Sequence, residues 1–97
     1  MNRTRYSTAI REVHAKSDAT IERETAQKWL ARAVACCRER TTASGAAREE
    51  WSRRAWEYRA EALEHAALVG DGGRTVAAIE GEIDREMSKC GMRARRR

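Results

Sequence analysis

The chain has 97 residues, a formal net charge of +5, no proline and three cysteines. Its length suits one folded domain, and it contains neither an apolar stretch approaching the roughly 18 residues that span a bilayer nor a signal-peptide pattern. The three cysteines, of which Cys36 and Cys37 are adjacent, cannot all pair within one chain and do not resemble a disulfide framework. This agrees with a reducing compartment, and we expect a cytoplasmic protein without membrane association.

The N-terminal part of the chain predicts two helices. The first begins at about Thr4 or Ser7 and ends at Lys16, and its apolar side chains recur at helical spacing: Tyr6, Ile10 and Val13. Ser17 and Asp18 favour a helix N-cap, so we expect a break there, followed by a second helix over residues 18–40. The second helix carries one apolar stripe, formed by Ala26, Trp29, Leu30, Ala33, Val34 and Cys37.

A third helix, predicted over residues 46–69, carries two apolar faces instead of one. The first face contains Trp51, Ala55, Tyr58, Ala62, Ala66 and Val69. The second lies about 120° to 180° around the helix from Trp51 and contains Trp56, Ala60, Leu63 and Ala67. A helix with two apolar faces has neighbours on two sides, so we expect this helix to be the long, central one.

A turn and a fourth helix complete the predicted fold. The segment from Gly70 to Gly73 predicts the turn, since glycine suits the left-handed position after a helix and Asp71 suits the cap of the next. The fourth helix has a narrow apolar stripe of Val76, Ile79, Ile83, Met87 and Cys90, and Gly91 should end it. The predicted fold class is all-α, a compact bundle of three to four helices with a long central third helix. We expect residues 1–92 to form a single helical domain and residues 93–97 to form a basic disordered tail.

No residue pattern in the chain predicts catalysis, a metal site or a cofactor. The two histidines, His14 and His65, and the three cysteines lack the Cys-x-x-Cys and His-x-x-x-His spacings of metal sites. The serines stand at predicted helix ends or on helix surfaces, and none lies in a nucleophile elbow. We therefore predict a non-enzymatic protein with no catalytic residue, no metal ligand and no cofactor.

The residues that we predict to bind a partner form the second apolar face of the third helix: Trp56, Ala60, Leu63 and Ala67. Short helices have little surface with which to cover both faces of that helix, and an uncovered aromatic face is a docking surface. If a neighbour does cover it, Trp56 belongs to the core, and the pattern leaves both arrangements open. The leading hypothesis is a protein-interaction module that regulates or inhibits a larger assembly. Its partner is another protein or, as a homodimer, a second copy of the chain.

Arginines near both ends of the chain support an alternative function in nucleic-acid binding. They are Arg3, Arg5, Arg11, Arg93, Arg95, Arg96 and Arg97. Such contacts to phosphates release counterions and add affinity without sequence specificity. The acidic fourth helix adjoins the C-terminal arginines, so nucleic acid is the less favoured partner. Small arginine-rich chains are typical of accessory proteins of phages and plasmids, including inhibitors of host defence, and that origin is a further hypothesis.

Overall fold

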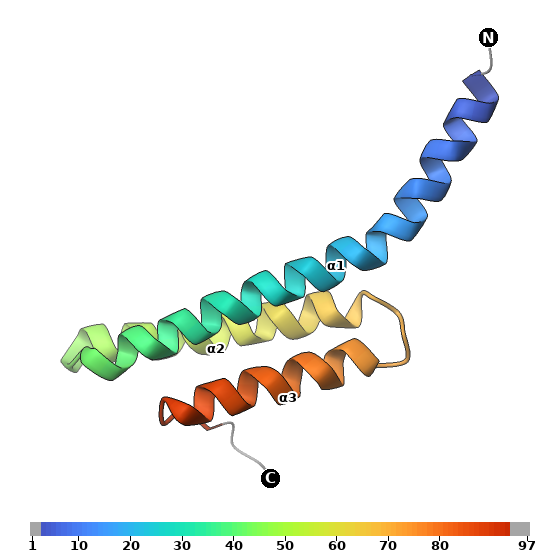
Figure 1. Ribbon diagram of the computed structural model, residues 1–97. Coiled ribbons are helices and arrows are strands. Elements are labelled where there is room, and N and C mark those ends of the chain that lie inside the picture. Colours follow the sequence, from blue (N-terminus) through green and yellow to red (C-terminus); the bar gives the residue numbers. More distant parts are fainter. Residues whose placement is uncertain (1–2, 94–97) are drawn as a thin grey trace.

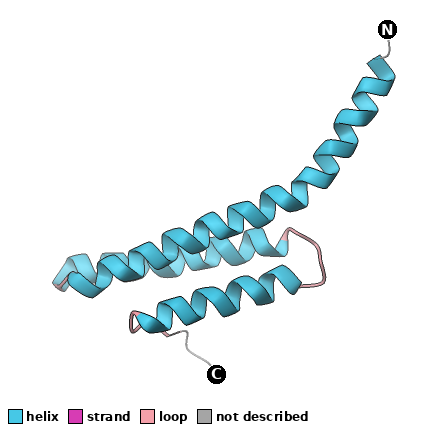
Figure 2. Ribbon diagram, viewed as in Figure 1, coloured by secondary structure: helices cyan, strands magenta, loops and turns pink. Residues whose placement is uncertain are grey.

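Three helices make up most of the described chain (Figure 1). The computed structural model describes the backbone of residues 3–93 and the side chains of residues 18–93. Helix α1 covers Arg3–Thr42, α2 covers Gly45–Ala67 and α3 covers Arg74–Lys89, and each contacts the other two. The described residues contain no strand (Figure 2). The predicted all-α bundle is therefore confirmed, with three helices.

The predicted break at Ser17 and Asp18 is wrong, because α1 continues through both residues. Serine and aspartate each cost a helix interior less than about 0.7 kcal/mol relative to alanine, and the stronger breakers glycine and proline do not occur between residues 3 and 42. The two N-terminal helices expected from the sequence are thus one helix of 40 residues. Its N-terminal part extends past the ends of α2 and α3 (Figure 1), and the molecule is elongated, measuring 64 × 27 × 17 Å.

The helix predicted to be long and central corresponds to α2. It has 23 residues against the 40 of α1, so the longest helix of the bundle is α1 and this part of the prediction is corrected. The two apolar faces of α2 do correspond to two neighbours, because α2 packs against both α1 and α3. Tyr58 of α2 packs against Trp29 of α1 with its ring tilted, while Arg59 of α2 forms an ion pair with Asp84 of α3.

The core combines small side chains from α1 and α2 with larger ones from α3. Many of the buried side chains of α1 and α2 are alanines: Ala26, Ala33, Ala55, Ala62 and Ala66. Alanine lets two helices approach closely but buries little apolar area. Most of the largest fully buried side chains come from α3, where the predicted stripe is confirmed at Ile79, Ile83 and Met87.

A tight turn after α3 returns the chain to the core. Gly91 adopts the left-handed conformation with a φ of 81°. The Met92 N–H donates to the Met87 carbonyl at 2.9 Å and the Gly91 N–H donates to the Ser88 carbonyl at 3.0 Å, the two bonds of a Schellman motif. Met92 is only 4% exposed, and its sulfur lies 3.2 Å from the Cys37 Sγ. Gly91 therefore ends the helix as predicted, and Met92 belongs to the core.

Asp71 connects the α2–α3 loop to the first turn of α3. Its carboxylate accepts hydrogen bonds from the Thr75 hydroxyl at 2.6 Å and from the Thr75 N–H at 3.2 Å. The Arg23 guanidinium of α1 lies 3.8 Å away. The hydrogen bonds from Thr75 favour the charged carboxylate and lower the pKa of Asp71. Asp71 thus bonds to the first turn of α3, but the predicted N-cap position is wrong, because Gly73 and not Asp71 occupies it.

Ile83→Ala should lower the free energy of unfolding by about 2 to 5 kcal/mol, because Ile83 is fully buried and the truncation leaves a cavity. Ile83→Val is the matched control at the same site and should cost only about 0.5 to 1.5 kcal/mol. Urea unfolding followed by circular dichroism measures both values. Small and equal losses in the two variants would contradict the position of Ile83 in the core.

Asp71→Ala should destabilise the protein at neutral pH, and the difference from the wild type should shrink in acid. The pKa of Asp71 is lower in the folded chain than in the unfolded chain, so its stabilising contribution is present above the unfolded pKa of about 3.9. That contribution is lost as the pH falls through the lower, folded value. Urea unfolding of both proteins at a series of pH values tests this, and a difference that grows on acidification would refute it.

Candidate functional site

The predicted docking face of α2 is divided between covered and exposed positions. Trp56 and Leu63 are half-buried and pack against the core, whereas Ala60 and Ala67 are exposed. The side of α2 that carries Trp56 also carries Arg59, whose Nε donates to the Asp84 carboxylate of α3 at 2.8 Å. The covered half of the face is therefore the half turned towards α3. A role for these four residues in partner binding stays a prediction.

The aromatic side chains of the described residues lie at the edges of the core. Trp29, Trp51, Trp56 and Tyr58 are all half-buried, while the largest fully buried side chains are isoleucines, a methionine and a cysteine. Trp29 and Tyr58 meet where α1 and α2 adjoin, with ring centroids 5.3 Å apart and planes inclined at 42°. The two rings thus pack on each other and each keeps part of its surface in contact with solvent.

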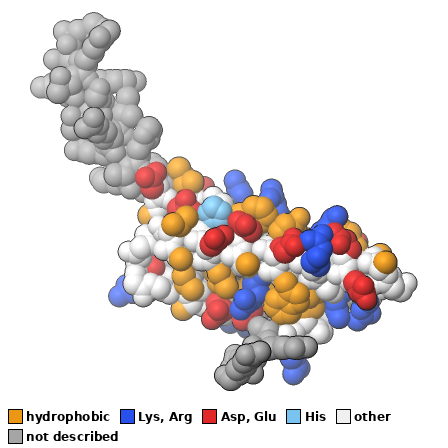
Figure 3. Space-filling model, turned by 180° about the vertical axis from the view of Figure 1, so that it is seen from behind, with side chains coloured by type: hydrophobic (Ala, Val, Ile, Leu, Met, Phe, Trp, Pro, Cys, Tyr) orange, Lys and Arg blue, Asp and Glu red, His pale blue; other side chains and the backbone are white. Residues whose placement is uncertain are grey.

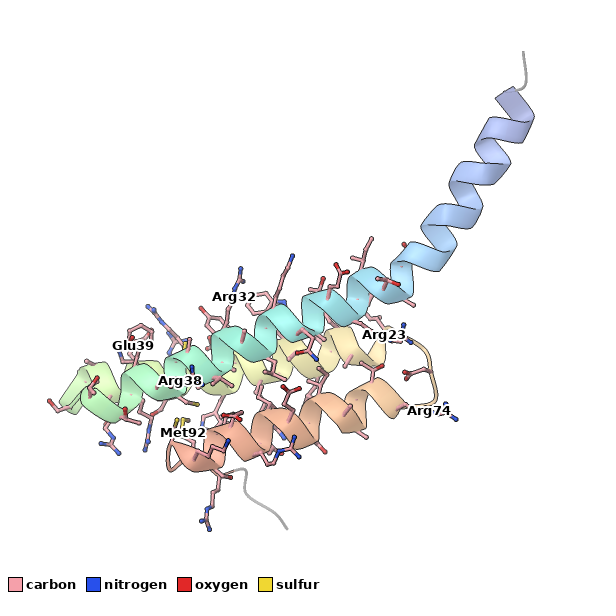
Figure 4. All side chains as sticks on the ribbon, in the orientation of Figure 1. Arg23, Arg32, Arg38, Glu39, Arg74 and Met92 are labelled. Carbon is pink, nitrogen blue, oxygen red and sulfur yellow. The ribbon has the colours of Figure 1, made fainter. Side chains whose placement is uncertain are left out.

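Two arginines extend this aromatic pair into a larger surface. The guanidinium carbon of Arg32 lies 4.7 Å from the centre of the Trp29 ring, and that of Arg54 lies 5.4 Å from the centre of the Trp51 ring. Both distances suit an attraction between the cation and the face of the ring. Figure 4 shows Arg32 pointing away from α3. We call the surface formed by Trp29, Arg32, Trp51, Arg54 and Tyr58 the aromatic face.

The aromatic face lies on the side of the α1–α2 pair that is turned away from α3. On α1, Gln27 lines a cavity together with Ile79 of α3, and Trp29 lies about 200° further around the helix. On α2, Tyr58 lies about 100° from Arg59, which bonds to α3. Figure 3, seen from behind, shows hydrophobic side chains interspersed with charged ones. Within residues 18–93, α3 covers one side of the α1–α2 pair and leaves the aromatic side open.

Charges of opposite sign mark the two ends of the aromatic face. Arg32 and Arg54 stand at one end. At the other, the His65 Nδ1 lies 2.7 Å from the Glu22 carboxylate and its Nε2 lies 3.8 Å from the Glu61 carboxylate. Beside the tryptophans, Arg54 forms an ion pair with Glu50 at 3.0 Å, whereas Arg32 forms none with the described residues. The surface thus carries an unpaired arginine at this end and carboxylates about two helical turns away.

A second candidate site is a cavity where α1 and α3 end beside α2. It has a volume of 570 Å³, and we call it the Arg40 pocket; its walls include Arg40, Ser52, Trp56, Arg59, Met92 and Arg93. The Arg40 Nε donates to the Ser52 hydroxyl at 2.8 Å, and its Nη1 donates to the Cys90 carbonyl at 3.0 Å. Trp56 therefore belongs both to the predicted docking face and to this pocket.

Of the side chains predicted to contact nucleic acid, the structure describes only that of Arg93. Arg93 is exposed and lines the Arg40 pocket. The predicted basic tail beyond Arg93 lies outside the described residues. The other six predicted side chains are not among the described ones either: Arg3, Arg5, Arg11, Arg95, Arg96 and Arg97. Nucleic-acid binding thus stays an expectation from the sequence.

The three thiols differ in exposure. Cys36 and Cys37 are buried and Cys90 is half-buried, and all three are free. Burial raises the pKa of Cys36, and it raises that of Cys37 to about 11. Within the described residues, no group of three or more histidine, cysteine or carboxylate side chains is placed to hold a metal ion.

The aromatic face and the Arg40 pocket were not predicted from the sequence. Trp29 and Trp51 stand on apolar stripes, and periodicity gives the direction of a side chain but not how much of it a neighbour covers. Arg40 is one of many basic residues on the surface of a predicted helix. The glycine at position 91 was the one signal in the sequence for a turn there.

Comparisons with protein-family models, curated proteins and solved structures gave no match in any of the three. In the part of the chain that the structure describes, none of the helices combines the length and the apolar character needed to cross a membrane. Evidence about function therefore comes from the aromatic face and the Arg40 pocket.

Iodoacetamide should modify Cys90 before Cys36 and Cys37. The two α1 thiols are buried and their raised pKa values leave little thiolate at neutral pH, whereas Cys90 is half-buried. Partial labelling followed by peptide mass spectrometry gives the order of reaction. Modification of Cys37 in the first phase would contradict its placement against Met92.

Proposed function

We propose that the protein is a non-enzymatic interaction module that binds another protein through the aromatic face and thereby regulates or inhibits a larger assembly. The observation that carries this proposal is the grouping of two tryptophan–arginine pairs and Tyr58 on the side of the α1–α2 pair away from α3. Tryptophan, tyrosine and arginine are the residue types that contribute most to binding energy in protein interfaces.

The aromatic face is also held in place before any partner arrives. Trp29 packs on Tyr58, and Arg32 and Arg54 lie over the two tryptophan rings. All five residues project from helices rather than from loops. Side chains that are already ordered lose less conformational entropy on binding, so more of the contact energy appears as affinity.

The charges around the aromatic face define the chemistry of the partner. Arg32 and Arg54 favour acidic side chains, and the tryptophan and tyrosine rings favour apolar ones. Glu22 and Glu61 lie at the other end, beside His65, and repel further acidic groups there. We therefore propose that the partner presents an amphipathic helix whose apolar stripe covers the rings and whose acidic residues lie at the arginine end.

The three free cysteines support action in a reducing compartment, and we propose the cytoplasm. A second copy of the chain is the other candidate partner for the same surface.

The double charge reversal Arg32→Glu with Arg54→Glu tests the proposal. The partner is first identified by photo-crosslinking from a probe placed beside the aromatic face, and is then purified. The variant should bind the purified partner at least about tenfold more weakly, because both arginine contacts become repulsive. Both side chains are exposed, so the melting temperature should change little.

Arg85→Glu, an exposed charge reversal on α3, is the matched control and should leave the affinity unchanged. Undiminished binding by the double variant would refute the aromatic face as the docking surface. If Trp56→Ala abolished binding while the double variant did not, the face predicted from the sequence would be the docking surface instead. Sedimentation equilibrium of the wild type and the double variant identifies the case in which the partner is a second copy.

The alternative function, nucleic-acid binding, makes a different prediction for the same experiment. If the crosslinked partner is lost on nuclease treatment, and if its affinity falls steeply with salt concentration, nucleic-acid binding is favoured. In that case the loss should follow substitution of Arg93, Arg95, Arg96 and Arg97 rather than reversal of Arg32 and Arg54.

A further inference from the structure

The Arg40 pocket contains a positive charge that the described residues do not neutralise. Among residues 18–93, carboxylates lie within ion-pairing distance of several other arginines, including Arg23, Arg53 and Arg59, but not of Arg40. Arg40 is partly buried and bonds to two neutral acceptors, the Ser52 hydroxyl and the Cys90 carbonyl. A guanidinium withdrawn from water and given only neutral acceptors is a favourable place for an anion.

The other two arginines of the pocket differ in how far their charges are neutralised. Arg59 lies 2.8 Å from the Asp84 carboxylate and 3.5 Å from that of Glu80, so its charge is largely compensated. Arg93 is exposed and forms no ion pair with any of the described residues. Two uncompensated guanidiniums therefore line one cavity.

The pocket offers an apolar surface beside these charges. Trp56 lines it and is half-buried, and Met92 contributes a second apolar wall. A volume of 570 Å³ is in the range of small-molecule sites, about 300 to 1,000 Å³. A ligand that fits these walls combines a compact negative charge with a flat, partly apolar group.

We propose that the Arg40 pocket binds a small phosphate monoester whose organic part is planar, such as a nucleoside monophosphate. The phosphate takes hydrogen bonds from Arg40 and Arg93, and the planar group lies against Trp56. A phosphate monoester carries about −1.5 to −2 charges at neutral pH and matches two guanidiniums better than a single carboxylate does. This ligand site is distinct from the aromatic face.

The fold explains how residues so far apart in the sequence form this site. The Schellman turn at Gly91 directs the Cys90 carbonyl to the Arg40 Nη1 and brings Arg93 to the pocket. Ser52 accepts from the Arg40 Nε and donates to the Arg48 carbonyl, which fixes its hydroxyl. Arg40 is therefore oriented by both neighbouring helices before a ligand binds.

Isothermal titration calorimetry with adenosine monophosphate tests the proposal on the full chain. The wild type should bind it, should bind glycerol phosphate and inorganic phosphate more weakly, and should not bind adenosine. Arg40→Gln and Arg93→Gln should each weaken binding of adenosine monophosphate at least about tenfold, the loss of a charge-assisted contact. Arg93 is exposed, so Arg93→Gln keeps the test valid if Arg40→Gln proves unstable.

Arg74→Gln is the matched control, because Arg74 is exposed and lies at the opposite end of α3 from Met92 (Figure 4). It should bind adenosine monophosphate as the wild type does, and so should the Arg32→Glu, Arg54→Glu variant. Three outcomes would overturn the proposal. The wild type does not bind adenosine monophosphate, the Arg93→Gln and Arg74→Gln variants bind it with equal affinity, or glutarate binds as strongly as the nucleotide. An oligonucleotide that binds much more tightly than the mononucleotide through the same arginines would overturn it in favour of nucleic acid.

Discussion

The close contact of α1 with α2 through alanines determines where the large side chains of the bundle lie. Ala26 and Ala33 of α1 and Ala55 and Ala62 of α2 have no exposed surface. Helices that approach on such small residues leave no room between their axes for an indole ring. The aromatic residues therefore lie at the edges of the contact, half-buried. α3 fills the groove on one side of the contact with isoleucine and methionine, and the aromatic face lies on the other side.

The end of α3 imposes a second constraint, on the Arg40 pocket. Gly91 has a left-handed φ of 81°, a conformation that residues with a Cβ rarely adopt. A Cβ at Gly91 would lie 3.8 Å from the Arg40 Nη1, so the turn is directly beside the Arg40 guanidinium. The same turn buries Met92 against Cys37. Burial of one sulfur and exposure of the neighbouring Arg93 thus follow from a single glycine.

The sequence predicted the features that depend on local periodicity and missed those that depend on neighbours. The α3 stripe, the two faces of α2 and the glycine turns were correct because each follows from residue spacing or backbone preference. The break at Ser17 and Asp18 was wrong because a weak N-cap preference does not outweigh helix propensity on both sides. The Arg40 pocket could not be predicted, since its residues come from positions 40, 52 and 93 and only the tertiary fold unites them.

The continuity of α1 also explains why the aromatic side of the α1–α2 pair is open within the described residues. With four helices, a short N-terminal helix could turn back at residue 17 and cover the groove of Trp29 and Tyr58, leaving the Trp56 side of α2 to find a partner. Because α1 instead runs on past the ends of α2 and α3 (Figure 1), α3 is the one helix of the described chain that is left to cover the pair. The ion pair of Arg59 with Asp84 places α3 on the Trp56 side. Both apolar faces of α2 therefore have a helical neighbour, and the aromatic face lies on the side of the α1–α2 pair that α3 does not cover within the described residues.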